Sequence, residues 1–324
     1  MRALQVNEFA DPSKISVSEV PERDPGASEV KIRVGGVGIG YFDGLLVKGE
    51  YQIKPPLPFI PGSSIAGEVE SVGDKVTNVK PGDKLAAFTL LGGLAEKAVL
   101  PADSIVKLPD SIDLEEAANF FIAYATGVLG LKELARTRPG EKVMILGASG
   151  TTGSTAIEIA KAMGAEVIAC ASTEEKRDKC IESGADHAID YTLEDWRKQV
   201  KAIAPDGVDV VYDPIGGRWA ETALRSMAAG GRYLIVGFVD GIAQIPFNLP
   251  LLKRCAIMGV NWGGEVFANP GIVSPVINQI IEWAVAGKLK TAPDKVYALD
   301  EASEAFAALF NRQSVGKIVI NPSR

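Results

Sequence analysis

The fold of this chain is decided by the stretch Lys142-Val143-Met144-Ile145-Leu146-Gly147-Ala148-Ser149-Gly150-Thr151-Thr152-Gly153. Five mostly apolar residues, typical of a buried strand, run directly into a glycine-rich turn, and an apolar-faced helix is predicted over residues 153–163. Ala148, Gly150 and Gly153 occupy the small-residue positions of a dinucleotide-binding fingerprint, with alanine in place of the first glycine. The helix amino terminus would offer N–H groups to a pyrophosphate. A tight turn without a ligand is the alternative interpretation.

Strand and helix patterns alternate around this stretch. Further strands are predicted over 166–169, 208–212, 231–236 and 256–260, and further helices over 124–135, 173–183 and 218–226. Strands that alternate with helices of this length form right-handed βαβ units, whose sheet is parallel and covered by helices on both faces. The sequence therefore predicts an α/β protein with a doubly wound parallel sheet.

The amino-terminal third has a different pattern. Residues 29–34 alternate between polar and apolar, residues 66–72 are mostly apolar, and Pro and Gly residues separate such segments. Short strands with these turn signals are typical of a barrel or a sandwich. At the other end of the chain, two predicted helices precede a strand-like segment at 316–320, which could return to this β-rich part. The α/β part would then be inserted into the β-rich part.

Composition and charge exclude several classes of protein. A net charge of −7 argues against a general nucleic-acid binder, which usually presents a basic face. Three cysteines, Cys170, Cys180 and Cys255, are too few for a disulfide framework and fit a reducing compartment. A membrane span needs about 20 apolar residues, and no segment has that pattern. We therefore expect a cytoplasmic protein with neither a membrane nor a nucleic acid as partner.

The single histidine limits the possible chemistry. A zinc site with two or three histidines is excluded by this count. His187 lies in a segment that reads as a turn leading into a short strand. We expect His187 on the surface or at the rim of a ligand site, and not as a general base.

The end of the second predicted strand of the α/β part indicates which nicotinamide cofactor is preferred. An NAD site usually carries an acidic residue there, which binds the ribose 2′-hydroxyl. This chain has Ser172 at that place, and Lys176 follows in the next helix. The hydroxyl and the ammonium group suit a 2′-phosphate, which favours NADPH. The alternative is that Lys176 is an ordinary solvated helix residue.

Ordered landmarks extend over nearly the full length of the chain. They include Pro61-Gly62, Ala66-Gly67, Pro81-Gly82-Asp83-Lys84, Tyr124-Ala125-Thr126, the fingerprint, Gly184-Ala185-Asp186-His187, Val211-Tyr212-Asp213, Gly230-Gly231-Arg232 and Leu251-Leu252-Lys253-Arg254. In these landmarks the chain resembles the zinc-independent medium-chain dehydrogenases/reductases of the quinone oxidoreductase (zeta-crystallin-like) group. The resemblance implies a GroES-like catalytic domain from residues 1–122 and 266–324. It also implies a Rossmann NADPH-binding domain from residues 123–265, with the active site in the cleft between them.

The resemblance also implies the residues that bind NADPH. The turn would contribute Ala148, Ser149, Gly150, Thr151, Thr152 and Gly153. Ser172, Lys176, Tyr191 and Arg312 match family positions around the 2′-phosphate. Thr126, Gly237, Phe238 and Val239 match positions that line the nicotinamide half. A homodimer is implied as well, in which the edge strand 256–260 would pair with a second subunit.

Zinc ligands of related dehydrogenases are replaced in this chain. Those relatives carry a cysteine near position 37 and Gly-His-Glu near position 62, where this chain has Val37 and Gly62-Ser63-Ser64. We therefore expect no metal. Without a Lewis acid to polarise an oxygen atom, alcohol dehydrogenation is disfavoured, whereas hydride transfer to an electron-poor acceptor remains feasible.

Reduction of a quinone by NADPH is the leading functional hypothesis. An NADPH-dependent reductase of enones or enoyl thioesters is the alternative enzyme, and an NADPH-binding sensor or structural protein with little turnover is the alternative of another class. Tyr51 and Asp43 are the candidate catalytic residues. The alternative interpretations are that Asp43 orients the backbone and that Tyr51 forms a wall of the pocket. Relatives often have Asn and Glu at the positions of Gly40 and Ser64, so these two substitutions affect the expected substrate site.

Overall fold

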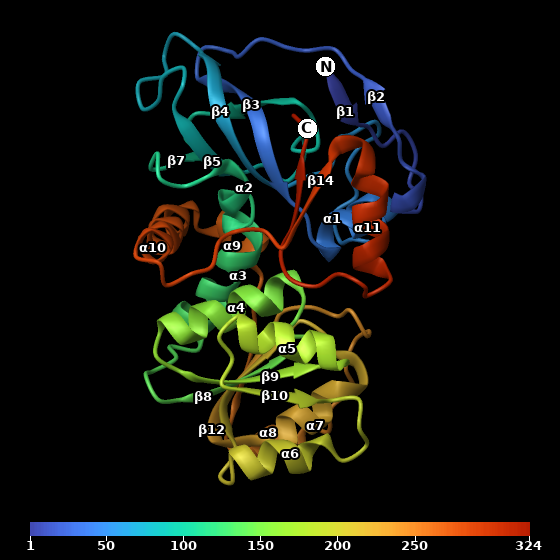
Figure 1. The fold of residues 1–324 in the computed structure, drawn as a ribbon, viewed down its shortest axis with the longest axis vertical. Coiled ribbons are helices and arrows are strands. Elements are labelled where there is room, and N and C mark those ends of the chain that lie inside the picture. The colour runs from blue at the N-terminus through green and yellow to red at the C-terminus, as the bar shows by residue number, and fades with distance from the viewer. The chain divides into compact units, whose positions relative to one another are not determined.

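A computed structural model describes residues 1–324, which form two compact units. The first comprises Met1–Ala123 and Thr291–Arg324, and the second comprises Tyr124–Lys290 (Figure 1). The chain thus passes between the units twice, so the second unit is inserted between two segments of the first. The sequence placed residues 266–290 with the first unit. They lie in the second because helix α10 (Val273–Val285) packs on the helical segment that opens the second unit.

The first unit is built on a seven-stranded sheet with the order β14-β15-β3-β4-β5-β7, in which β6 also pairs with β3. These strands are β3 (Glu29–Gly38), β4 (Ser64–Val72), β5 (Lys84–Phe88), β6 (Lys97–Pro101), β7 (Ile105–Lys107), β14 (Lys295–Ala298) and β15 (Ile318–Asn321). β15 pairs antiparallel with β3, with Val319 opposite Gly38 and Ile320 opposite Val37. The carboxy-terminal strand therefore returns to the amino-terminal sheet, as the sequence predicted. A separate hairpin joins β1 (Arg2–Leu4) and β2 (Val17–Glu19).

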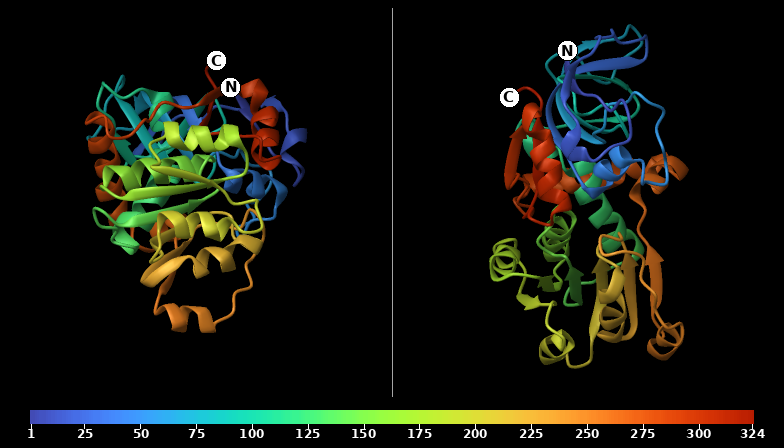
Figure 2. Two further views of the ribbon diagram at one scale, coloured as in Figure 1. Left: turned by 60° about the horizontal axis from the view of Figure 1, so that its bottom comes forward. Right: turned by 90° about the vertical axis from the view of Figure 1, so that its right-hand side faces the viewer.

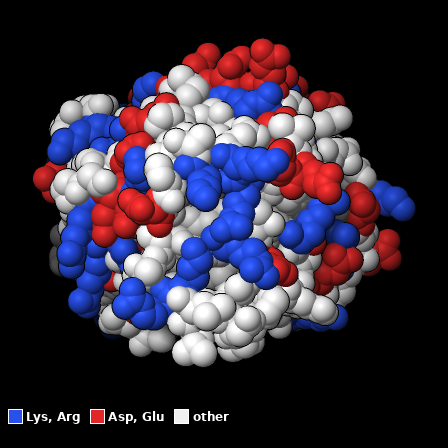
Figure 3. Space-filling view, turned by 90° about the horizontal axis from the view of Figure 1, so that it is seen from below, with Lys and Arg blue, Asp and Glu red and all other residues white.

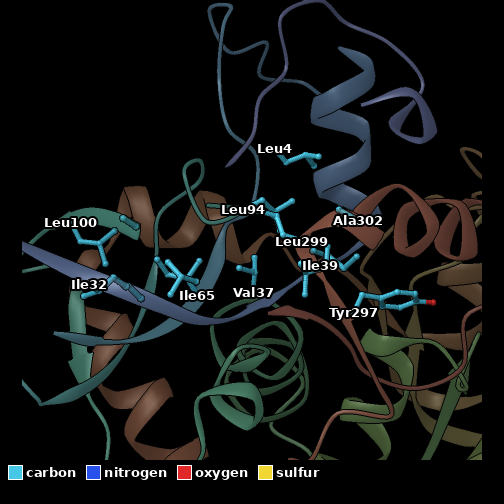
Figure 4. Packing of buried hydrophobic residues seen from close by; sticks show 14 of the residues in the cluster. Leu4, Ile32, Val37, Ile39, Ile65, Leu94, Leu100, Tyr297, Leu299 and Ala302 are labelled. Atoms are coloured by element: carbon cyan, nitrogen blue, oxygen red, sulfur yellow. The ribbon is translucent and has the colours of Figure 1, made fainter. Parts of the chain in front are cut away.

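The core of this unit holds both of its chain segments together. Ile32 and Val37 of β3 and Ile65 of β4 are fully buried. They share a hydrophobic cluster with Leu299 and Ala302 from the carboxy-terminal segment (Figure 4). Burial of each large aliphatic side chain contributes about 1.5–3 kcal/mol. The carboxy-terminal segment is therefore part of the core of this unit.

The helices of the first unit are short and include one that the sequence analysis missed. They are η1 (Pro12–Lys14), α1 (Tyr41–Lys48), α2 (Leu114–Ala117), η6 (Leu299–Glu301), α11 (Ala302–Phe310) and η2 (Phe120–Tyr124), whose last residue belongs to the second unit. α1 lies in a region that was expected to be β-rich. It ends at Gly49, whose φ of 66° is the left-handed conformation that favours glycine at a helix end. Gly44 in the middle of α1 is unfavourable in a helix, so the sequence did not indicate one here. The structure explains this glycine, because a side chain at that position would collide with Phe310.

The second unit contains the predicted parallel sheet, with the strand order β10-β9-β8-β11-β12-β13. Its strands are β8 (Lys142–Leu146), β9 (Glu166–Ala171), β10 (His187–Asp190), β11 (Val208–Asp213), β12 (Met227–Ile235) and β13 (Ala256–Gly259). All five neighbouring pairs are parallel. The reversal of strand order next to β8 marks the switch point at which such sheets bind ligands, beyond the carboxyl ends of the strands. We call that edge of the sheet the carboxyl edge and the opposite one the amino edge.

Helices cover both faces of this sheet (Figure 2). They are α3 (Ala125–Gly127), η3 (Val128–Leu134), α4 (Thr151–Ala162), α5 (Glu174–Glu182), α6 (Trp196–Ile203), η4 (Gly217–Trp219), α7 (Ala220–Arg225), α8 (Asn248–Lys253), α9 (Trp262–Ala268), η5 (Pro270–Ile272) and α10. α6, α7 and α8 pack on one face through a shared hydrophobic cluster, and α4 and α5 lie on the other. The α/β fold class with a β-rich and a doubly wound part is confirmed. No helix is both long and apolar enough to cross a membrane.

Candidate functional site

The turn between β8 and α4 is held in a fixed shape by the backbone. Gly147 has a φ of 56°, and the N–H of Ala148 donates to the carbonyl of Cys170 in β9 at 3.1 Å. The N–H of Gly150 closes the turn on the carbonyl of Gly147 at 3.1 Å. This geometry brings the first residues of α4 to the carboxyl edge, next to the end of β9.

The two later glycines of the fingerprint have different roles. A Cβ at Gly153 would lie 2.4 Å from the carbonyl oxygen of Gly147 and 2.7 Å from Cα of Ala148. Gly153 is thus required for packing of the helix on the turn. A Cβ at Gly150 would meet only the Gly147 oxygen, at an ordinary 3.6 Å. The chain itself therefore tolerates a side chain at Gly150, and the space in front of this residue is available to a ligand.

The amino end of α4 supplies the electrostatics of the turn. Gly150 precedes the helix with extended dihedral angles and has no side chain to cap it. α4 is 12 residues long, so its aligned peptide dipoles place a partial positive charge at this end. Ser149 and Thr151 are buried here, and Thr152 is partly exposed. This arrangement suits a phosphate group.

A second polar group lies at the end of β9. Ser172 is partly exposed immediately after the strand, and no acidic residue stands between it and α5. Thr173 caps α5 by accepting a hydrogen bond from the N–H of Lys176 at 3.3 Å. The next residue, Arg177, pairs with Asp190 at the end of β10, with its Nη1 atom 3.0 Å from Oδ2. The hydrogen bond to Thr173 thus fixes the backbone of Lys176 in the first turn of α5, four positions after Ser172.

Tyr191 extends this group from the neighbouring strand. Asp190 pairs with Ala171 in the sheet, so the residues that follow them, Tyr191 and Ser172, leave the carboxyl edge side by side. The Tyr191 ring contacts Trp219 edge-to-face, with the centroids 4.8 Å apart. Trp219 follows β11, so the contact joins loops from separate strands of the sheet.

Asp213 organises the loops at the end of β11. Its carboxylate accepts hydrogen bonds from the N–H groups of Ile215 and Gly216, both at 2.8 Å, and from the Tyr233 hydroxyl at 2.5 Å. Burial raises the pKa of Asp213, and these three hydrogen bonds act against that rise. The sequence analysis used Asp213 only as a landmark, and no local pattern shows the Tyr233 contact.

The segment Gly237-Phe238-Val239 follows β12 and is tied to the end of β11. The N–H of Gly237 donates to the Asp213 carbonyl at 3.3 Å. A Cβ at Gly237 would lie 2.8 Å from the carbonyl oxygen of Pro214, so glycine permits this close approach. Phe238 is half exposed. Thr126, the other residue expected on the nicotinamide side, lies partly exposed in α3 of the same unit.

The remaining predicted site residues belong to the first unit. Asp43 is fully buried near the start of α1 and accepts hydrogen bonds from the Gly40 N–H and the Ser63 hydroxyl, both at 2.9 Å. Burial raises its pKa to about 6, against the lowering effect of these hydrogen bonds. Tyr51 packs edge-to-face on Phe42 with centroids 4.6 Å apart, and partial burial raises its pKa. Arg312 follows α11 with a φ of 57°.

The positions at which the sequence analysis found zinc ligands replaced are occupied by groups with structural contacts. Val37 is fully buried in β3. The Ser64 hydroxyl is buried and donates to the carbonyl of Ala118 at 2.5 Å. No group of three or more His, Cys, Asp or Glu residues is arranged to hold a metal ion.

His187 lies away from the glycine-rich turn. It begins β10 at the amino edge, and its Nε2 atom is 3.1 Å from Oε1 of Glu166, which begins β9. The turn follows the carboxyl end of β8, at the other edge of the same sheet. This position argues against a role for His187 at the carboxyl edge.

Two protein families match the chain in the corresponding segments. The family described as "Alcohol dehydrogenase GroES-like domain" matches residues 26–110, in the first unit. The family described as "Zinc-binding dehydrogenase" matches residues 151–278, in the second. The second match includes the helix that follows the glycine-rich turn.

Individual relatives cover the whole chain. "Quinone oxidoreductase-like protein 2 homolog" of Nematostella vectensis is 37% identical over 99% of this chain and 88% of its own length. The crystal structure of Escherichia coli quinone oxidoreductase complexed with NADPH matches with a TM-score of 0.91 and 25% identity, over 99% of this chain and 100% of that one. The CurK enoyl reductase structure matches with a TM-score of 0.88 and 25% identity, over 99% and 98%. The chain therefore belongs to the quinone oxidoreductase group of the medium-chain dehydrogenase/reductase family.

Proposed function

We propose that this protein is a zinc-independent reductase that uses NADPH to reduce quinones. The observation that carries the proposal is the glycine-rich turn at the carboxyl edge, with open space in front of Gly150 and a serine instead of an acid after β9. The family assignment makes the protein an oxidoreductase. The Escherichia coli relative, which binds NADPH, supports the choice of cofactor.

The described residues fit each part of this cofactor. The pyrophosphate would lie against Gly150 and the amino end of α4, with Ser149, Thr151 and Thr152 around it. The 2′-phosphate would lie by Ser172 and Lys176, with Tyr191 and Arg312 as further candidates. An acid directly after β9 would repel that phosphate, and this chain has Ser172 there, with Glu174 and Glu175 following in the first turn of α5. Thr126 and residues 237–239 would line the nicotinamide, which supplies the hydride when the cofactor is bound.

The class of acceptor is inferred from the zinc ligands that the chain does not bring together. The donors of a zinc site are not brought together, so the chain offers no Lewis acid for an alcohol or a simple carbonyl. A quinone is already electron-poor, and its reduced ring is aromatic, so little stabilisation by the protein is needed. Tyr51 is the proposed proton donor on the substrate side, because a phenol carries its proton at neutral pH and the resemblance places this residue at the acceptor pocket. Asp43 would position the Gly40 and Ser63 segments by its two hydrogen bonds.

Reduction of an enone or enoyl thioester is the second candidate, favoured by the likeness to the CurK enoyl reductase. A thioester on a phosphorylated carrier would need a basic approach to the carboxyl edge. Lys253 and Arg254 are instead at the amino edge, where the Lys253 ammonium group donates to the carbonyl of Met227, the first residue of β12. Figure 3 shows Lys and Arg side chains extending across the face covered by α6, α7 and α8. This basic surface therefore does not favour a carrier-bound substrate, and a small enone is the better alternative.

The experiment that tests the proposal compares initial rates of NADPH oxidation with benzoquinone, phenanthrenequinone and a simple enone at equal concentrations. Reactions without enzyme and reactions with NADH are the controls. We expect faster turnover with a quinone than with the enone, and faster turnover with NADPH than with NADH. Turnover of the enone alone would move the assignment to double-bond reduction. Normal NADPH binding without turnover of any acceptor would instead favour the sensor or structural protein.

We also propose that the protein is a homodimer that pairs through β13. β13 is the outermost strand of the parallel sheet, and β12 is its only neighbour in that sheet. In the segment that precedes this strand in the chain, Phe247, Leu251 and Leu252 expose 86%, 77% and 71% of their surfaces. An edge strand next to exposed apolar side chains is usually covered by a partner. A second copy would cover both features across a two-fold axis.

A further inference from the structure

We propose that Arg218 binds the 2′-phosphate and is a determinant of NADPH specificity. The inference rests on the proposed function, since it adds a residue to the cofactor site of the same enzyme. Sequence reasoning did not identify Arg218, which lies 42 positions beyond Lys176 in the chain and follows a different strand. Its place at this site follows from three successive contacts.

The first contact is between neighbouring strands. Asp190 of β10 pairs with Ala171 of β9, so Tyr191 and Ser172 leave the sheet side by side. The second is the edge-to-face contact of Tyr191 with Trp219, at 4.8 Å between centroids. The third is the Arg218 guanidinium, whose Cζ atom lies 4.5 Å from the centroid of the Trp219 ring. Arg218 is therefore brought to the Ser172 side of the carboxyl edge by the tertiary structure.

The charge of Arg218 remains available to an anion. Its side chain is 71% exposed, and Asp240, the acidic group paired with it, has its Oδ2 atom 3.7 Å from Nε. At this distance the pair is not a close hydrogen bond. Arg177, by contrast, is engaged with Asp190 at 3.0 Å. A guanidinium can donate two parallel hydrogen bonds to a phosphate, which suits Arg218 to this ligand.

The loop that carries Arg218 is anchored before any ligand binds. The Asp213 carboxylate accepts the N–H of Gly216, and the N–H of Gly217 donates to the carbonyl of Gly241 at 2.7 Å. Gly217 has a φ of 55°, and a Cβ there would lie 2.4 Å from the carbonyl oxygen of Asp240. Only glycine permits this approach of the two loops. The backbone at Arg218 is thus held in place, and the long side chain alone has to move toward a phosphate.

The contact would discriminate between cofactors through charge. NADPH carries the 2′-phosphate and NADH carries a hydroxyl in its place, so loss of the guanidinium should affect NADPH. An exposed ion pair contributes at most about 1 kcal/mol, which corresponds to about a fivefold change in affinity. Salt screens such a pair, so the preference should also decrease at high ionic strength.

The test measures binding of adenosine 2′,5′-bisphosphate and of AMP by calorimetry to the full-length protein and to Arg218→Ala and Arg218→Lys. The matched control is Arg225→Ala, an exposed arginine of α7 that pairs with Glu221 on its own helix. We expect Arg218→Ala to weaken the affinity for the bisphosphate about fivefold and the affinity for AMP less than twofold. The affinity of Arg218→Lys for the bisphosphate should lie between those of the unchanged protein and Arg218→Ala. The control variant should bind both ligands as the unchanged protein does. Thermal unfolding of each variant separates loss of binding from loss of fold.

Three results would overturn the role of Arg218. Full retention of bisphosphate affinity in Arg218→Ala would show that the guanidinium does not contact the phosphate. Equal weakening of both ligands would show that Arg218 acts on the adenosine or on the loop. Because neither ligand contains nicotinamide, failure to reduce quinones leaves this measurement intact. If the unchanged protein itself does not prefer the bisphosphate, the preference for NADPH is wrong and the proposal for Arg218 falls with it.

Discussion

Asp43 and Asp213 are carboxylates withdrawn from solvent, and each stabilises the backbone of a turn. Asp43 accepts the Gly40 N–H ahead of α1, and Asp213 accepts the N–H groups of Ile215 and Gly216 after β11. Burial is the largest effect on the pKa of both groups and raises it. A buried charge is tolerated only with such hydrogen bonds. Each of these residues therefore fixes a loop of its own unit, and a direct part in proton transfer is not needed to explain their burial.

The raised pKa of Asp43 predicts a specific dependence of stability on pH. The folded pKa is about 6, above the ordinary value of 3.8, so the folded state takes up this proton more readily than the unfolded state. The resulting stabilisation is fully present below the ordinary pKa and is lost as the pH rises through about 6. Relative to Asp43→Asn, the unchanged protein should gain roughly 2–3 kcal/mol of unfolding free energy on acidification across this range.

Urea unfolding of both proteins at several pH values between about 4 and about 7 measures this gain. The matched control is Asp110→Asn, because Asp110 is exposed. The difference in unfolding free energy between Asp110→Asn and the unchanged protein should not show this gain on acidification. A constant difference between Asp43→Asn and the unchanged protein would contradict the prediction.

At the scale of elements, the β8–turn–α4 unit separates packing from binding. Gly153 is enclosed by the backbone of Gly147 and Ala148, whereas Gly150 faces open space. The fingerprint residues look equivalent in the sequence, since each is small. The structure assigns Gly153 to close packing of the helix and leaves the space in front of Gly150 open.

Alanine substitutions at these two glycines should therefore affect different properties, namely stability at Gly153 and NADPH binding at Gly150. Gly153→Ala places a methyl group 2.4 Å from a carbonyl oxygen, so we expect unfolding free energy to fall by about 1–3 kcal/mol. Gly150→Ala should leave stability nearly unchanged and weaken NADPH at least tenfold, because the methyl group occupies space needed by the pyrophosphate. Thermal unfolding and NADPH titration of both variants measure the two effects. Normal NADPH affinity in a folded Gly150→Ala protein would refute the assignment of this turn.

At the scale of the whole molecule, each unit joins parts of the chain that are distant in sequence. In the first unit, β15 completes the sheet beside β3. In the second, the buried Glu158 of α4 accepts hydrogen bonds from the Tyr124 hydroxyl at 2.7 Å and the Lys290 N–H at 2.8 Å. Tyr124 and Lys290 are the first and last residues of that unit. One side chain thus binds both places at which the chain crosses between the units.

The proposed dimer gives a prediction at the same scale. Leu251 and Leu252 are largely exposed in the segment that precedes β13, so replacing both with Glu should place charge in the proposed interface. We expect the unchanged protein to sediment as a dimer at micromolar concentration and the double variant to sediment as a monomer. Leu193→Glu is the control. Leu193 is also exposed, but it follows β10, the outermost strand on the other side of the sheet. A monomeric unchanged protein would exclude the proposed dimer.

Much of the architecture could be predicted from local patterns. The strand 142–146, the glycine-rich turn and the succession of βαβ units depend on periodicity and on small residues at fixed spacing, which are properties of short segments. The same analysis missed α1, because Gly44 is unfavourable in a helix and is explained only by its contact with Phe310. It also assigned residues 266–290 to the first unit, whereas contact clustering groups them with the second, because α10 packs on α3 and η3, about 150 positions earlier in the chain.

The sequence by itself determined the fold class, the position of the glycine-rich turn and the serine directly after β9, because each is encoded within a few neighbouring residues. The tertiary structure alone decided that Tyr191, Trp219 and Arg218 meet at one place, that Asp213 binds Tyr233, and that Lys253 lies at the amino edge. These relations join residues from different strands. They depend on strand order and register, which follow from how the whole sheet buries its apolar faces.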